Sequence, residues 1–349
     1  MKNPLAIVGD IHLGIKSDSS DFHEVHTEFF KWTRELFLDN GVNTVIQLGD
    51  WWHNRNEINV KTLNVGLECQ KLWSPFTQIS IIGNHDTYYK TTNDVTSMNI
   101  FASNQNLVVI SKPVEIKLFG DKEALFVPWI VNITSFIDFL KHKNKTYDYM
   151  FGHFEVDGGL VSRNAVIHSK LKATDLTQFA KKIFSGHFHI RRMDGEIMYV
   201  GAAMPLTWGD VNETSCVHLL HEDGSVQEFK NEISPMFIEI VLSELVKTKQ
   251  FPTIKNNHVR LVVDIKIAED KLNKLIDIIK QKLPQSFISI YAGYQLEVDA
   301  QFSTEKISDP LTMIDEYIGA VEIGEHMNID KKELTRRAHE LFNIALQEQ

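Results

Sequence analysis

The chain has 349 residues, 43% of them hydrophobic and 23% charged, and a formal net charge of −10 at pH 7. These values predict a globular protein with one large domain and smaller additions, and the acidic balance argues against binding nucleic acid by bulk charge. The two distant cysteines, Cys69 and Cys216, argue against a disulfide framework or a thiolate zinc site, and no apolar run approaches the roughly 20 residues of a membrane helix.

The first half of the chain alternates short apolar strands with helical patterns, which predicts an α/β core. Three β-rich runs each end in glycine and are followed at once by polar residues; they are Leu5 to Gly9, Thr44 to Gly49 and Ile79 to Gly83. Helical patterns lie between them, at about 22–39 and 59–73. Ligands gather where the strands of such folds end, so the polar residues after these runs are the first candidates for a site.

The same pattern returns further along the chain, at Tyr147 to Gly152 and at Ile183 to Gly186. Further strands are predicted at 197–201, 215–220 and 226–229. From 234 onward the pattern changes to strands at 236–242, 258–267 and 286–291 with a helix around 269–283. We therefore predict three parts: a catalytic domain over 1–233, a small α+β capping domain over 234–302 and a helical region over 303–349.

The C-terminal region is predicted to form two amphipathic helices. Asp309-Pro310 is a typical helix start, and Asp330 to Glu333 resembles a capping box. The apolar stripe of the second helix includes Leu334, Leu341 and Phe342, and such a stripe must be buried against something. It either packs on the chain's own core or binds a partner. The chain has no GxxxxGK[ST] phosphate loop, so any ATP-driven step would belong to another protein.

Five short polar motifs each follow a predicted strand. They are Asp10-Ile11-His12, Gly49-Asp50, Gly83-Asn84-His85-Asp86, Gly152-His153 and Gly186-His187-Phe188-His189. Each motif alone is weak, because Gly-Asp is a common turn and an isolated Gly-His means little. All five together, each at a strand end, indicate residues that converge in space.

The chemistry of this set points to two divalent metal ions. Hydrolysis of a phosphodiester needs an activated water and a sink for charge on the phosphoryl oxygens, and two ions about 4 Å apart supply both. Carboxylate, amide and imidazole ligands without thiolate suit manganese, iron or zinc better than magnesium. A glycine before each ligand lets the backbone turn tightly.

This ordered set resembles the calcineurin-like metallophosphoesterase superfamily over roughly Leu5 to Gly201. The resemblance implies a four-layer α/β/β/α core. It implies a first metal held by Asp10, His12, Asp50 and His189, and a second held by Asp50, Asn84, His153 and His187. His85 would be the general acid that protonates the leaving oxygen. Asp86 either orients His85 or serves a local turn.

The residues after Asp50 narrow the resemblance. His53 stands three positions after Asp50, where protein phosphatases of the superfamily typically have aspartate followed by Arg-Gly. This histidine resembles that of the SbcD and Mre-eleven recombination nucleases, where it contacts the scissile phosphate; a surface histidine without a role is the alternative. Val127-Pro128-Trp129 and Leu206-Thr207-Trp208-Gly209-Asp210 resemble the T-even phage branch of that family. One departure is Asn56-Glu57 where SbcD-type proteins often have proline.

The resemblance implies a manganese-dependent nuclease of DNA recombination, repair and replication. It would act as a 3′–5′ exonuclease on double-stranded DNA and an endonuclease on single strands, with a capping domain that assists DNA binding. Its partner would be an SMC-like ATPase of the SbcC type, bound by a homodimer within a heterotetramer. We expect it in the cytoplasm of a bacterium, or of the host if a phage encodes it, without a membrane. The alternatives are a metallophosphatase or small-molecule phosphodiesterase, and a catalytically silent scaffold for the ATPase.

One basic stretch departs from the acidic total. Between Gly158 and Met193 seven basic residues stand against one acidic residue, Asp175, for a net charge of +6. The candidates for binding a DNA backbone are Arg163, Lys170, Lys172, Lys181 and Lys182. A solvated charged face is an equally good interpretation.

Overall fold

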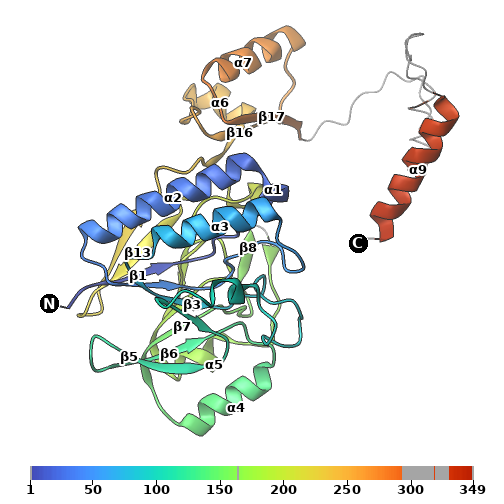
Figure 1. The fold of residues 1–349 in the computed structure, drawn as a ribbon. Helices are drawn as coiled ribbons and strands as arrows, with labels where there is room; N and C mark the ends of the chain where they lie inside the picture. The colour runs from blue at the N-terminus through green and yellow to red at the C-terminus, as the bar shows by residue number, and fades with distance from the viewer. Residues whose placement is uncertain (1, 163–164, 293–317, 319–329, 348–349) are drawn as a thin grey trace. The chain divides into compact units, whose positions relative to one another are not determined.

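A computed structural model describes residues 2–162, 165–292, 318 and 330–347. The chain forms two compact units, 1–292 and 293–349. Figure 1 shows the fold coloured along the chain. No helix among the described residues is long and apolar enough to cross a membrane.

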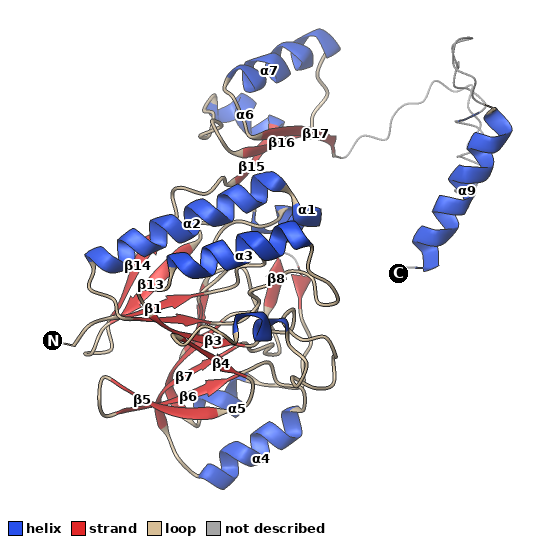
Figure 2. Ribbon diagram, in the orientation of Figure 1, coloured by secondary structure: helices blue, strands red, loops and turns tan. Residues whose placement is uncertain are grey.

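The first large sheet has six strands in the order β14-β13-β1-β2-β3-β4. The four strands β1 to β4 run parallel, and β13 and β14 add an antiparallel edge. Helices α2 (Ser20–Asp39) and α3 (Val60–Leu72) cover its outer face (Figure 2). The strands are β1 (Leu5–Val8), β2 (Thr44–Gln47), β3 (Thr77–Ile81), β4 (Leu107–Ile110), β13 (Cys216–Leu220) and β14 (Val226–Lys230).

The second large sheet also has six strands, in the order β11-β12-β10-β7-β6-β5. Strands β6, β7, β10 and β12 run parallel, and β5 and β11 are antiparallel edges. Helices α4 (Ile133–Lys143) and α5 (Ala173–Thr177) pack on its outer face. The strands are β5 (Val114–Leu118), β6 (Lys122–Val127), β7 (Tyr147–Gly152), β10 (Ala180–Ser185), β11 (Arg192–Asp194) and β12 (Ile197–Tyr199).

The two sheets pack face to face, so the core has four layers. Alternate residues of β1 point to opposite faces: Ala6 packs in the cluster that contains α2, whereas Ile7 packs between the sheets with Phe151 and Phe184 of the second sheet. A parallel strand that is covered on both faces must be apolar throughout, which explains the unbroken run from Leu5 to Val8. The predicted α/β/β/α core is confirmed.

A three-stranded parallel sheet follows, in the order β15-β16-β17. It consists of β15 (Phe237–Val241), α6 (Leu242–Thr248), β16 (His258–Val263), α7 (Glu269–Gln281) and β17 (Ser286–Tyr291). The predicted strands and the helix after Glu269 are present, and α6 was not predicted. Arg260 of β16 lies over the ring of Trp208, 4.5 Å from its centroid, which ties this sheet to the core.

Several helices and strands were not predicted from the sequence. Strand β5 has exposed and half-buried positions except at its end, so it lacks the apolar run by which the central strands were recognised. Helix α4 begins at Asn132, whose side chain accepts a hydrogen bond from the Ser135 N–H at 2.9 Å. The other short elements are α1 (Ile15–Asp18), the 3-10 helices Ser97–Phe101 and Trp208–Asp210, and the hairpin of β8 (Leu160–Ser162) and β9 (Ala165–Val166).

In the second unit the structure describes Ile318 and helix α9 (Lys331–Gln347). Asp330 precedes the helix, and its carboxylate accepts a hydrogen bond from the Lys332 N–H at 2.9 Å, so Asp330 caps the N-terminus of the helix. Leu334 is 39% exposed. Leu341 and Phe342 lie in α9, but their side chains fall outside the description. The helix predicted after Pro310 lies outside the described residues except for Ile318.

Candidate metal centre

The five motifs meet at one edge of the two sheets. Asp10, Asp50 and Asn84 follow the neighbouring parallel strands β1, β2 and β3. His153 and His187 follow β7 and β10, which are parallel neighbours in the facing sheet. Because the carboxyl ends of parallel strands lie at the same edge, residues separated by up to 180 positions come together.

Asp50 is central to the cluster. Its carboxylate oxygen Oδ2 lies 3.5 Å from His12 Nε2 and 3.3 Å from His153 Nε2. The other oxygen accepts a hydrogen bond from the His85 backbone N–H at 2.8 Å. Asp50 is 2% exposed, so it is a buried carboxylate placed between two groups of imidazoles.

The first group contains Asp10, His12 and His189. One ligand atom from each lies within 4.8 Å of the others. The closest approach joins His189 Nε2 and His12 Nε2, at 3.1 Å, and Asp10 Oδ2 lies 3.9 Å from the same atom of His189. With Asp50 beside His12, the structure brings together the four residues expected around the first metal.

The second group surrounds the Asn84 side chain. Its oxygen Oδ1 lies 2.9 Å from His153 Nε2 and 3.1 Å from His187 Nδ1. Asp10, Asp50 and His153 also bring ligand atoms within 4.8 Å of one another, so the two groups adjoin. The structure thus brings together the four residues expected around the second metal.

Three of the imidazoles are anchored on one nitrogen and aimed with the other. His153 Nδ1 donates to the Leu48 carbonyl oxygen at 2.8 Å, His187 Nε2 lies 3.4 Å from Glu155 Oε2, and His189 Nδ1 lies 3.6 Å from Asp210 Oδ1. Their second nitrogens are those that face Asn84, Asp50 and His12. Metal-binding histidines are typically held in this way by an outer carbonyl or carboxylate. The residues present therefore fit a pair of divalent cations.

The electrostatics of the buried cluster also favour cations. Burial raises the pKa of Asp10, although His153 opposes the shift. Burial would also raise the pKa of Asp50, but the charge and hydrogen bond of His153 hold it below its usual value. Burial disfavours the charged form of His153, yet Asp50 and Asp10 raise its pKa to about 9. The carboxylates of Asp50 and Asp10 thus favour positive charge within this cluster.

The backbone is strained where the cluster forms. The φ values of His12, Asp50 and His187 are 51°, 54° and 82°. They lie in the left-handed region, which residues other than glycine rarely adopt. A Cβ atom on Gly83 would collide with the carboxylate of Asp50. The glycine at this position is therefore required by the close approach of the two loops.

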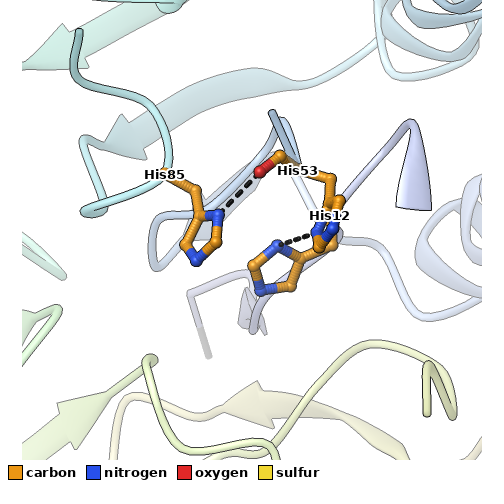
Figure 3. A group of neighbouring side chains, drawn as sticks. All are labelled: His12, His53 and His85. Atoms are coloured by element: carbon orange, nitrogen blue, oxygen red, sulfur yellow. Dashed lines mark hydrogen bonds between the residues drawn. The ribbon is translucent and has the colours of Figure 1, made fainter. Parts of the chain in front are cut away.

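His85 and His53 lie beside His12 (Figure 3). The His85 Nδ1 donates to the His53 backbone carbonyl at 2.6 Å, which leaves its Nε2 as the nitrogen free to exchange a proton. The His53 ring is stacked on that of His85, with centroids 5.6 Å apart, and its Nδ1 lies 3.4 Å from His12 Nδ1. Burial, followed by the charge of His85, lowers the pKa of His53 to about 4.

The Asp86 side chain stabilises the local backbone and does not contact the His85 ring in the hydrogen bonds of the described residues. Its carboxylate accepts hydrogen bonds from the backbone N–H groups of Gly83 at 2.9 Å and Trp52 at 3.1 Å. It therefore joins the loops that carry Asn84 and Asp50. Of the two roles left open by the sequence, the structure shows this one.

Three contributors were not identified from the sequence alone. Asp210 and Glu155 contact His189 and His187, and the Trp129 ring lies 5.3 Å from that of His187. Trp129 and Asp210 stand within segments that were noted only for their family resemblance. A usable signal for Asp210 was Thr207-Trp208-Gly209-Asp210, because aspartate three residues after threonine is a capping pattern, and the Asp210 carboxylate does accept from the Thr207 N–H at 2.8 Å.

Two lysines of the basic stretch, Lys181 and Lys182, have partners of their own in the structure. Lys181 pairs with Asp148 at 2.8 Å, and the Lys182 ammonium donates to the Gly224 carbonyl at 2.5 Å. Both lie in the first half of β10, whereas His187 follows its far end. Lys170 and Lys172 are exposed beside α5, and Arg163 lies outside the described residues.

Residues 4–191 match the calcineurin-like phosphoesterase family, and this chain belongs to that family. The match contains all seven residues of the candidate metal centre.

Over 97% of its length the chain is 25% identical to exonuclease subunit 1 of enterobacteria phage T4, and it covers 98% of that protein. Among solved structures it is similar to GAP50, the anchor in the inner membrane complex of Plasmodium, with 13% identity and a TM-score of 0.39, covering 82% of this chain and 96% of that one.

Proposed function

We propose that this phosphoesterase is a metal-dependent DNA nuclease, the nuclease subunit of a recombination and repair complex. The observation that carries the proposal is the position of the candidate metal centre next to His53 and His85, whose rings stack on each other beside His12. The full-length similarity to a phage exonuclease subunit supports a nucleic acid as the substrate.

Each metal would be held by one of the two groups, with Asp50 shared. The first ion would bind Asp10, His12, Asp50 and His189, and the second Asp50, Asn84, His153 and His187. Manganese is the ion we expect, because the ligands mix carboxylate, amide and imidazole without thiolate. When bound, the two ions supply Lewis acidity to the phosphoryl group and to the attacking water.

The chain's own residues perform the proton transfer and position the substrate. His85 holds its Nδ1 proton against the His53 carbonyl, so a proton on Nε2 is the one it gives to the departing oxygen of the nucleotide. The His53 ring is half-buried beside His85. It contacts the scissile phosphate and positions this phosphate next to His85.

The proposed partner is an SMC-like ATPase of the SbcC type, bound by a homodimer of this chain within a heterotetramer. Two observations support it: the sequence has no phosphate loop of its own, and α9 carries the apolar residue Leu334 at an exposed position. The relative from phage T4 is itself named a subunit. Exonuclease action in the 3′–5′ direction on duplex DNA, and endonuclease action on single strands, belong to the same proposal.

The test is digestion of end-labelled duplex and single-stranded DNA by the purified chain with added manganese, with and without the ATPase. An Asp50→Asn variant purified in parallel controls for contaminating nucleases. DNA cleavage that requires manganese and Asp50 supports the proposal. Hydrolysis of p-nitrophenyl phosphate without DNA cleavage would favour a phosphatase. Absence of bound metal and of both activities would favour a silent scaffold.

A further inference from the structure

A cavity of about 290 Å³ adjoins the candidate metal centre. Its walls include Pro113, Trp129, Phe136 and Phe139, and they are mostly apolar. Trp129 belongs to both places, because its ring lies 5.3 Å from the His187 ring and 6.0 Å from the His153 ring. A molecule bound at the metals could therefore extend a flat group into this cavity.

Trp129 is fixed by the loops that carry the metal-site residues. Its backbone N–H donates to the Ile82 carbonyl at 2.8 Å, immediately before Gly83 and Asn84. Its own carbonyl accepts a hydrogen bond from the Asn93 side-chain nitrogen at 2.9 Å. Trp129 also follows the end of β6, which pairs with β7 just before His153. The indole is thus held at a set position relative to the centre.

Asn93 lines the cavity and also supports Trp129. Its oxygen Oδ1 is buried and has no hydrogen-bond partner among the described residues, while its nitrogen is occupied by Trp129. The accessible polar atom that Asn93 contributes is therefore not this oxygen, and its role here is to hold the Trp129 backbone. Lys112 is the one charged residue among those that line the cavity. The cavity thus offers aromatic residues and a positive charge.

We propose that this cavity binds one unpaired nucleobase of the DNA strand whose phosphate lies at the metal centre. The inference rests on the proposed nuclease function and adds a subsite to it. The base stacks on Trp129. Because every base has an aromatic face, the subsite tolerates all four bases.

The dimensions favour one base over a base pair. The volume is at the lower end of the range of about 300–1,000 Å³ in which small ligands bind. A base inside it must leave its pairing partner, as it does in enzymes that move a base out of the helix. The subsite therefore favours frayed ends and single strands beside the scissile phosphate.

The experiment compares wild type, Trp129→Ala and Trp129→Phe on end-labelled oligonucleotides with manganese. One oligonucleotide is intact, and two others carry an abasic residue on the 5′ or the 3′ side of the scissile phosphate. Stacking of one base is worth about 1–3 kcal/mol, so we expect wild type to lose roughly 5- to 150-fold in kcat/KM on one abasic substrate. On intact DNA, the kcat/KM of Trp129→Ala should fall by a similar factor. On the abasic substrate that wild type cleaves poorly, Trp129→Ala should show no loss relative to wild type. Trp129→Phe should retain most of the activity on intact DNA.

Equal losses of Trp129→Ala on intact and abasic DNA would overturn the proposal, because Trp129 would then only position the histidines. Metal content and thermal midpoint, measured on every variant, identify a variant that has lost its fold or its ions. In that event the wild-type comparison decides alone: equal cleavage of intact and both abasic substrates would show that the cavity holds no base. Wild type that cleaves no DNA at all would count against the nuclease function.

Discussion

The Nδ1 atom of His85 lies 2.6 Å from the backbone carbonyl oxygen of His53, and this one contact fixes which nitrogen of His85 can act. This carbonyl belongs to the backbone, so a mutation of the His53 side chain leaves its hydrogen bond to His85 in place. The two roles that we propose, proton donation by His85 and substrate contact by the His53 ring, are therefore separable by mutation.

We expect His85→Ala to lose roughly 10² to 10⁴ in kcat on DNA, the usual contribution of general acid catalysis. The loss should be small on a nucleotide p-nitrophenyl ester, because p-nitrophenolate leaves without protonation. Metal content, measured by elemental analysis, should stay at the wild-type value. Loss of metal from this variant, or equal losses on both substrates, would contradict the assignment of His85 as the acid.

Asp50→Asn should lower the occupancy of both metal sites, whereas His12→Ala should lower one. The reason is the position of Asp50 Oδ2, close to His12 and to His153. Asparagine tolerates the left-handed backbone at this position, so the variant removes charge with little change of conformation. Asp121→Asn, at an exposed position, is the matched control. Elemental analysis of the three variants is the measurement, and equal occupancy in Asp50→Asn and His12→Ala would refute a shared ligand.

Asp210→Asn should weaken binding of one metal by about 10- to 100-fold, as for other outer partners of metal-binding histidines. Asp210 faces His189 through Oδ1, while Oδ2 accepts from the backbone N–H groups of Leu206 and Thr207. Asparagine keeps one oxygen for those N–H groups, so the fold should survive. Metal titration followed by calorimetry checks the prediction, with the thermal midpoint as control; unchanged affinity at both sites would remove Asp210 from the centre.

His218 should make the metal-free protein less stable in acid. The residue is fully buried, neither ring nitrogen has a hydrogen-bond partner among the described residues, and burial, aided by the charge of Arg191, lowers its pKa to about 4. The pKa of this histidine is 6.5 in the unfolded chain. Between pH 6.5 and pH 4 the unfolded chain therefore binds a proton that the folded chain does not, and stability is lost as the pH falls through this range. The loss totals about 3 kcal/mol.

His218→Leu should remove this part of the pH dependence and raise the free energy of unfolding at pH 7 by about 1–3 kcal/mol, because an unsatisfied buried polar group is replaced by an apolar one. Urea titrations between pH 4 and pH 7 in the presence of a chelator give both quantities. His142→Leu, at an exposed position on α4, controls for the loss of a histidine. Parallel pH profiles of wild type and His218→Leu would show that His218 is not the titrating group.

Removing residues 304–349 should leave metal content and basal nuclease activity intact but abolish co-purification with the ATPase and stimulation by ATP. Leu334→Glu, at an exposed position of α9, should reproduce the loss of binding without truncation. Pull-down with the purified ATPase and parallel nuclease assays are the measurements. Aggregation or loss of metal in the truncated chain would assign these helices to the catalytic domain.

The strand ends and their polar residues were predictable because the carboxyl ends of parallel strands converge, so Asp10, Asp50 and His153 could be grouped by position alone. The partners of those residues were not predictable in the same way. Asp210 reaches His189 from a 3-10 helix beyond the last motif, and no local period links the two. The sum of charges between Gly158 and Met193 likewise gave no sign that Lys181 is paired with Asp148 of the neighbouring strand.

The pairing of β1 with β13 also bears on how the protein is made. Leu5 of β1 pairs with Leu220 of β13, and β14 follows β13 at the edge of the sheet. The first strand to be synthesised therefore pairs with one of the last two strands of its sheet. All seven residues of the candidate metal centre have been synthesised once His189 is added, yet at that point one edge of β1 is unpaired, and the strand carries apolar residues on both faces. Such an edge is prone to pairing with other chains. We therefore expect this sheet to be complete only after translation has passed Lys230, and a chain arrested between those two points to be a target for chaperones.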